Sequence, residues 1–136
     1  MARLARVVIA GVPHHVTQRG NGRQQTFFET GDYALYLDLL AAAAARAHAE
    51  IWSYCRMPNH VHIVLTPSDE GGLSRTFGDL HRRYTGYVNA RRRTTGHLWQ
   101  GRFGSVAWTI TSSGWSLPWR GLATSPPSWV RTSTRR

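Results

Sequence analysis

One stretch constrains the fold of this chain more than any other. Residues 54–67 read Y-C-R-M-P-N-H-V-H-I-V-L-T-P, so a turn-forming Met-Pro-Asn segment precedes a β-branched and apolar run, which is typical of a strand that leaves a tight turn. Because successive side chains alternate across a strand, His60 and His62 share one face. The other face takes the apolar side chains of Val61, Ile63 and Leu65. The pattern therefore predicts a sheet that is packed on one face and carries two histidines on the other.

The two histidines are candidate metal ligands. They lie one strand step apart, roughly 7 Å at the backbone, so their rings can converge on one divalent ion and leave coordination positions open, as in catalytic metal sites. His-x-His also occurs in strands that bind nothing, and the pattern alone leaves both interpretations open. Cys55, with His14 nearby, offers a third interpretation, a structural zinc site with Cys55, His60 and His62 as ligands. The turn at Pro58 leaves the direction of Cys55 undetermined.

The charge of the chain is concentrated in its second half. The formal net charge is +10, yet residues 1–79 hold seven Arg and seven acidic residues, whereas residues 80–136 hold ten Arg and no Asp or Glu. A basic half beside a neutral half indicates a polyanionic partner. Nucleic acid fits best, because arginines displace counterions from phosphates.

Length and composition predict a single globular domain. A chain of 136 residues with 41% apolar and 11% aromatic residues is long enough to bury a core. The apolar run at Val7–Ala10 is too short for a secretory segment, and no stretch reaches membrane-spanning length, so we expect a cytoplasmic protein without a membrane partner. The single cysteine, Cys55, excludes an internal disulfide and agrees with a reducing compartment.

The first half of the chain predicts a strand, a helix and two further strands. A first strand is expected over residues 7–10 and 14–19, and one face of it carries His15, Thr17 and Arg19. Thr30 is the candidate cap of a helix. The apolar stripe of this helix consists of Tyr36, Leu39, Leu40, Ala43 and Ala47. Residues 51–56 form a second strand, which the turn at 57–59 reverses into the histidine strand.

The second half adds a helix and a final strand. The helix has an apolar stripe that consists of Leu73, Phe77, Leu80, Tyr84, Tyr87 and Val88. Residues 91–93 are expected in a loop, and residues 97–109 in a last strand that carries Trp99, Phe103, Val106 and Trp108. The resulting order is that of a ferredoxin-like α+β fold, a split βαββαβ arrangement with an antiparallel sheet and both helices on one face. The other face is free for a ligand.

Four blocks of the sequence resemble one family. They read H-V-T-Q-R-G-N-G-R-Q-Q-T-F-F at 15–28, the histidine stretch at 54–67, H-R-R-Y-T-G-Y-V-N at 81–89 and G-H-L-W-Q-G-R-F at 96–103. These blocks are similar to the REP-associated tyrosine transposases of the IS200-like group, within the HUH single-strand DNA nucleases. They cover roughly residues 12–108 at compatible spacing, and together they are far more specific than any one of them.

The resemblance implies a metal centre and a DNA partner. In this family the two histidines, here His60 and His62, hold a divalent ion, Mg²⁺ or Mn²⁺, that polarises a phosphate of single-stranded, hairpin-forming DNA. Softness rules applied to the imidazoles alone would suggest zinc instead. A homodimer is a further expectation. The candidate DNA contacts are Arg19, Arg23, Arg82, Arg83, Arg91, Arg92, Arg93 and Arg102, with a solvated surface as the alternative.

The nucleophile that the resemblance implies is missing, so no catalytic residue is assigned. The family attacks DNA with a tyrosine on a helix after the last strand. The five tyrosines here lie at 33, 36, 54, 84 and 87, and Tyr84 and Tyr87 fall on the buried stripe of the second helix. Residues 110–136 hold neither tyrosine nor acid, and their prolines at 118, 126 and 127 exclude a helix of useful length.

One domain with a C-terminal tail, and two alternative functions, follow as expectations. Residues 1–109 are expected to form the transposase domain, and residues 110–136 a poorly ordered tail that a frameshift near Thr109 produced. The chain is then either a transposase that cleaves and rejoins DNA or a remnant that binds DNA without a covalent link. An RNA-binding module of the same fold is disfavoured, because no strand carries the paired aromatic residues that stack bases.

Overall fold

The computed structural model describes residues 7–111, 114–116 and 131–132. Along the chain it contains β1 (His14–Arg19), a short 3₁₀ helix η1 (Asn21–Arg23), α1 (Thr30–Arg46), β2 (Glu50–Met57), β3 (His60–Thr66), α2 (Gly72–Arg92) and β4 (Gly104–Ala107). Three short strands follow, which are β5 (Thr109–Thr111), β6 (Gly114–Ser116) and β7 (Arg131–Thr132). Neither described helix is both long and apolar enough to cross a membrane.

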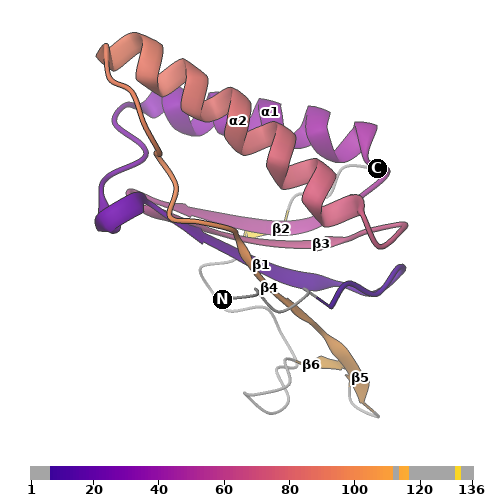
Figure 1. Cartoon of the computed structure of the whole chain (residues 1–136). Helices are drawn as coiled ribbons and strands as arrows, with labels where there is room; N and C mark the ends of the chain where they lie inside the picture. The colour runs from indigo at the N-terminus through magenta and orange to yellow at the C-terminus, as the bar shows by residue number, and fades with distance from the viewer. Residues whose placement is uncertain (1–6, 112–113, 117–130, 133–136) are drawn as a thin grey trace, which may run out of the picture.

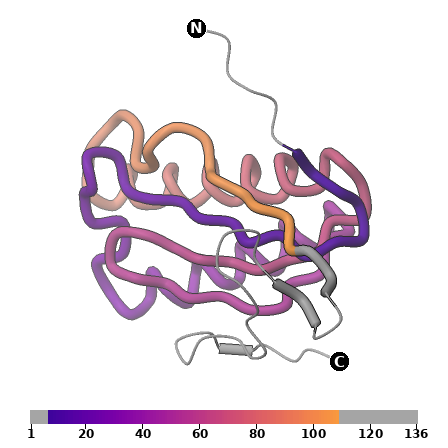
Figure 2. The backbone as a smooth tube through the Cα atoms, turned by 90° about the horizontal axis from the view of Figure 1, so that it is seen from below, coloured from indigo at the N-terminus to yellow at the C-terminus, as the bar shows by residue number. Residues whose placement is uncertain are grey.

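The main sheet has the strand order β4-β1-β3-β2-β7, and all of its neighbouring strands are antiparallel. Both helices lie on one face of this sheet (Figure 1), and the opposite face is turned toward the viewer in Figure 2. β7 adds only two residues, which pair with Ser53 and Tyr54 of β2. The strands β1 to β4 and the two helices form the predicted ferredoxin-like βαββαβ arrangement, so the expected fold class is confirmed.

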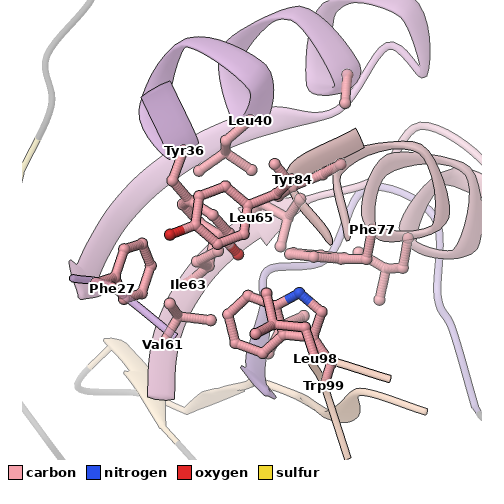
Figure 3. Close-up of a cluster of buried hydrophobic side chains, with 14 of the residues drawn as sticks. Phe27, Tyr36, Leu40, Val61, Ile63, Leu65, Phe77, Tyr84, Leu98 and Trp99 are labelled. Carbon is pink, nitrogen blue, oxygen red and sulfur yellow. The ribbon is translucent and has the colours of Figure 1, made fainter. Parts of the chain in front are cut away.

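The core lies between the sheet and the two helices (Figure 3). Val61, Ile63 and Leu65 of β3 are fully buried in it, as strand alternation predicts. The helices contribute large side chains, among them Tyr36, Leu40, Phe77, Leu80 and Tyr84. Burial of each large apolar side chain contributes about 1.5–3 kcal/mol, so packing against the sheet stabilises the helical layer.

The buried Tyr36 and the half-buried His81 form a hydrogen bond at the edge of this core. The Tyr36 hydroxyl lies 2.9 Å from Nε2 of His81, and the His81 ring stacks on Trp99 with centroids 4.6 Å apart. Burial lowers the pKa of His81 to about 3, so the imidazole is neutral and can accept the hydroxyl hydrogen bond. His81 therefore has a structural partner in Tyr36.

The first and last of the four predicted strands are shorter than the sequence predicts. β1 begins at His14, because residues 7–9 have no strand pairing and a turn follows them. Residues 97–103 form an irregular segment in which Leu98 and Trp99 are buried in the core. Backbone hydrogen bonds from Asn21 to Leu98 and from Gln100 to Arg19 tie this segment to the end of β1. Its aromatic residues pack in the core, and they do not form the expected strand.

The cap of α1 differs from the prediction. Glu29 precedes the helix and forms a capping box with Asp32, in which each side chain accepts a hydrogen bond from the backbone of the other residue. The prediction that Thr30 caps the helix is wrong, since Thr30 is its first helical residue. The pair satisfies backbone N–H groups that a helix leaves unpaired at its start.

The end of α2 also differs from the prediction. Arg91 and Arg92 are its last two residues, and the loop begins at Arg93, whose left-handed φ of 53° ends the helix. Tyr87 is 39% exposed, because the buried stripe runs through Tyr84 and Val88 and leaves position 87 on its flank. The prediction of a buried Tyr87 is therefore wrong.

The structure describes only part of the predicted tail. β5 and β6 form a two-stranded antiparallel hairpin after β4, and β7 comes from a later part of the tail. The other residues of 110–136 lie outside the described residues, and so does the expectation that they are poorly ordered. The domain boundary at 109 stays a prediction.

Candidate metal and nucleic-acid site

The open face of the sheet carries a pocket at one end of β1 and β3. The pocket has a volume of about 510 Å³, and its ionisable lining consists of His60, His62, Arg19, Arg23 and Arg102. The register between β1 and β3 explains why Arg19 lies near the histidine pair, because it places Arg19 directly opposite His60. Arg23 belongs to η1, and Arg102 belongs to the segment before β4. Five side chains that are distant in the sequence thus share one pocket.

Each histidine of the pair is held through its Nδ1 atom. His60 Nδ1 lies 2.8 Å from the side-chain oxygen of Asn59, and His62 Nδ1 lies 3.1 Å from Nε2 of His15. The His15 and His62 rings stack with an interplanar angle of 14°, whereas the His60 and His62 rings meet edge to face with centroids 5.1 Å apart. The sequence-based prediction that the two histidines share one face agrees with this geometry.

Burial and positive neighbours keep these imidazoles neutral. Desolvation, followed by His15, His60 and Arg19, lowers the pKa of His62 to about 4. Desolvation and then Arg19 lower the pKa of His60, and desolvation lowers the pKa of His15. Neutral imidazole is the form that binds metal ions, so protons compete little with a metal near neutral pH.

The two histidines fit an open metal site. Among the described residues, no three His, Cys, Asp or Glu side chains lie close enough together to hold one ion. Cys55 is opposite His62 in the register of β2 and β3, so it shares the open face, yet it completes no such group. His14 is fully buried: its Nδ1 donates to the Val12 carbonyl at 2.7 Å. This arrangement does not support the closed zinc site, whereas two imidazoles and open positions suit an ion such as Mn²⁺.

Arg82 and Arg83 lie outside the pocket, on α2, which covers the other face of the sheet. Both guanidinium groups bind Asp79, at 3.1 and 2.9 Å. Arg46 of α1 binds the same carboxylate. Hydrogen bonding from Arg83 is the main cause that lowers the pKa of Asp79 to about 2. Three cations share one carboxylate, so part of the positive charge of this surface is neutralised within the chain.

The three arginines at the end of α2 have separate environments. Arg91 donates two hydrogen bonds to the buried carboxylate of Asp32. The guanidinium of Arg92 lies over the Phe28 ring, 4.0 Å from its centroid. Arg93 is exposed at the helix end. Arg91 therefore has a structural partner, while Arg92 and Arg93 present their charge at the surface.

None of the five tyrosines lines the pocket, and the structure describes all five. Tyr36 and Tyr84 are fully buried, and desolvation raises the pKa of both hydroxyls above the ordinary range. Tyr33 and Tyr54 pack against the core, and Tyr87 lies on α2. Among the described residues, no tyrosine is placed to attack a phosphate in this pocket.

Sequence reasoning gave no role to two residues that contact the histidine pair. Strand alternation places His15 on the open face, but its contact with His62 depends on the pairing of β1 with β3. Asn59 belongs to the turn before β3, and an amide directly before a histidine is a weak signal by itself. Neither contact can be read from the spacing of residues along the chain.

The fold and the pocket define a class of protein, the ferredoxin-like α+β domains with a histidine pair and arginines on the open face of the sheet. Within this class, the chain belongs to the family described as Transposase IS200 like, whose sequence model matches residues 10–113. The family that the four sequence blocks indicate is thereby confirmed. No curated protein matches the sequence.

Two solved structures share the fold. One is a REP-associated tyrosine transposase bound to a REP hairpin, with 21% identity and a TM-score of 0.66, and the match covers 82% of this chain and 64% of that protein. The other is a candidate transposase from Deinococcus radiodurans R1, with 18% identity and a TM-score of 0.59, and the match covers 82% of this chain and 88% of that one. The chain thus spans less than two thirds of the first of these proteins.

Proposed function

We propose that this chain binds single-stranded, hairpin-forming DNA in the pocket on its open sheet face, with Mg²⁺ or Mn²⁺ held by His60 and His62. One observation carries the proposal, namely that the histidine pair lines the same pocket as Arg19, Arg23 and Arg102. Hairpin DNA as the ligand is supported by the structural relative that is bound to a REP hairpin. A DNA partner also agrees with the expected cytoplasmic location.

The residues of the pocket have different tasks in this proposal. Arg19, Arg23 and Arg102 bind phosphate oxygens, because a guanidinium presents paired N–H donors that match them. His60 and His62 present neutral imidazole nitrogens to the cation. A divalent ion held there supplies positive charge that polarises the phosphate. The pocket therefore orients a DNA strand by charge and holds one phosphate beside the histidine pair.

We further propose that the chain does not form a phosphotyrosine link with DNA. The support is the position of the five tyrosines, all of which lie outside the pocket. An active transposase is the second candidate function. The family and the histidine pair favour it, but among the described residues it lacks a nucleophile.

A labelled single-stranded hairpin incubated with Mn²⁺ separates the two candidates. We expect a shifted band on a native gel and no covalent band after denaturation. Binding should weaken with salt, with a log-log slope of about 0.7 per phosphate contact. Changing Arg19 and Arg102 to Gln should lower this slope by about 1.4, because two contacts are lost.

The matched control is the pair Arg82→Gln and Arg83→Gln, which removes the same charge from the helical layer. The control should change the slope little. A covalent band would establish the active transposase. A salt-independent shift, or equal effects of the two pairs, would contradict DNA binding in the pocket.

We propose that residues 110–136 replace the catalytic helix of the family through a frameshift near Thr109. The support is their composition, which lacks tyrosine and acid and includes prolines at 118, 126 and 127. In one of the other two reading frames past codon 109, the coding DNA is expected to continue with a helix-forming segment that contains Tyr-x-x-x-Asn or Tyr-x-x-x-Gln. Sequencing that finds no such segment in either frame would reject the frameshift.

A further inference from the structure

We propose that Asn59 and His15 are positioning residues that hold His60 and His62 with their Nε2 lone pairs toward the pocket. The inference rests on the proposed metal site and adds the hydrogen bonds that orient its ligands. Neither Asn59 nor His15 lines the pocket, and each contacts the Nδ1 atom of one histidine. Metal-binding histidines commonly use their second ring nitrogen in this way, which sets both the tautomer and the ring orientation.

The amide of Asn59 determines the tautomer of His60. Its Nδ2 lies 3.4 Å from the backbone oxygen of Arg23, and its Oδ1 lies 2.8 Å from His60 Nδ1. A backbone carbonyl can only accept, so the amide nitrogen points to Arg23 and the amide oxygen points to His60. His60 Nδ1 therefore carries the proton. The lone pair lies on Nε2, on the far side of the ring.

Backbone contacts hold Asn59 in place. The N–H of Gly20 donates to the Asn59 carbonyl at 2.8 Å, and the N–H of Thr26 donates to the Pro58 carbonyl at 2.8 Å. The loop after β1 is packed closely here, because a Cβ at Gly20 would lie 2.1 Å from the Gln24 carbonyl oxygen. Asn59 thus presents its amide from a turn with little freedom to move.

The hydrogen bond between His15 and His62 can run in two directions. If His15 Nε2 donates, the His62 proton lies on Nε2. If His62 Nδ1 donates, the lone pair lies on Nε2. Arg19 favours the second direction, because it lines the pocket together with His62, and a lone pair near a guanidinium is more stable than an N–H group there. The stacked ring of His15, with its centroid 5.2 Å from that of His62, restrains rotation of His62.

Long-range ¹H–¹⁵N NMR of the metal-free protein reports these tautomers directly, because protonated and unprotonated ring nitrogens have different ¹⁵N shifts. We expect a proton on Nδ1 and none on Nε2 in both His60 and His62. A proton on Nε2 of His62, with His15 as the donor, would overturn the role of His15. A proton on Nε2 of His60 would overturn the role of Asn59.

Variants separate positioning from folding. Asn59→Ala and His15→Leu remove the acceptors, so both should give mixed tautomers and lower the Mn²⁺ affinity about 10- to 100-fold, measured by electron paramagnetic resonance of the free ion. Asn59→Asp and His15→Gln keep an acceptor oxygen and should restore the Nδ1–H form. His97→Gln replaces an exposed histidine outside the pocket and is the matched control. Unchanged tautomers in Asn59→Ala and His15→Leu would contradict the inference.

Failure of the proposed metal site gives a different result. Expected tautomers in a wild-type protein that binds no Mn²⁺ would contradict the metal site and leave the two hydrogen-bond assignments standing. Mn²⁺ binding by a protein with the opposite tautomers would contradict the inference and leave the metal site standing.

Discussion

Mn²⁺ binding is expected to disappear when His60 and His62 are both replaced by alanine. Among the described residues, His60 and His62 are the only histidines that line the pocket. The described lining contains no Asp or Glu. The charges that remain belong to Arg19, Arg23 and Arg102, which repel a cation. The affinity should fall by more than about 100-fold, because loss of an outer hydrogen-bond partner alone costs 10- to 100-fold. Electron paramagnetic resonance of free Mn²⁺ measures the change.

The fold of this double variant should be retained. Both histidines are half-buried on the open face and lie outside the apolar core. Far-UV circular dichroism and the thermal midpoint should therefore stay close to those of the wild type. His97→Ala removes an exposed histidine elsewhere and controls for general loss of imidazole. Mn²⁺ binding that survives in the double variant would place the cation at another site.

The second large effect concerns stability and is centred on Asp32. Its carboxylate is fully buried and accepts hydrogen bonds from the backbone of Phe28 at 2.8 Å and of Glu29 at 3.0 Å, and also from Arg91. Asp32→Ala removes the α1 capping box and leaves the guanidinium of Arg91 without this partner. The free energy of unfolding should fall by about 3–5 kcal/mol, as measured by urea denaturation.

Replacing Asp32 should also change how the stability of the protein depends on pH. Hydrogen bonding from Arg91 is the main cause that holds the pKa of Asp32 below its ordinary value. Its contribution is therefore complete above the unfolded pKa of about 3.9 and is lost as the pH falls toward the lower folded pKa. Asp32→Asn cannot titrate, so its unfolding free energy should fall less steeply in this acidic range. If the unfolding free energies of the wild type and of Asp32→Asn depended on pH in the same way, the role of the pair would be contradicted. Additive effects of Asp32→Ala and Arg91→Ala in a double-mutant cycle would contradict it as well.

Local patterns in the sequence predicted the layers of the fold and the face of the histidine pair. The alternation of β3 separates His60 and His62 from the core residues, and the helical stripe of α2 is buried at Leu73, Phe77 and Tyr84. Each feature follows the residue repeat within a single strand or helix, so neither depends on contacts between distant segments. This is why they could be predicted without the structure.

Contacts between elements could not be predicted in the same way. Arg91 and Asp32 are 59 positions apart and meet only because α1 and α2 pack together. Trp99 lies in a segment with strand-like composition, yet it is buried in the core because hydrogen bonds to the end of β1 hold that segment irregular. The contact of His15 with His62 likewise requires the register of β1 with β3.

The pairing of the helical arginines with acids bears on how fast the proposed DNA ligand would reach the protein. Asp79 and Asp32 offset charge in the helical layer, whereas among the described residues Arg19, Arg23 and Arg102 form no ion pair with an acid. Unbalanced positive charge therefore remains at the pocket on the open face, and also at Arg92 and Arg93 at the end of α2. At the pocket, this charge would speed the approach of a polyanion at low ionic strength and would help to orient it toward the open face.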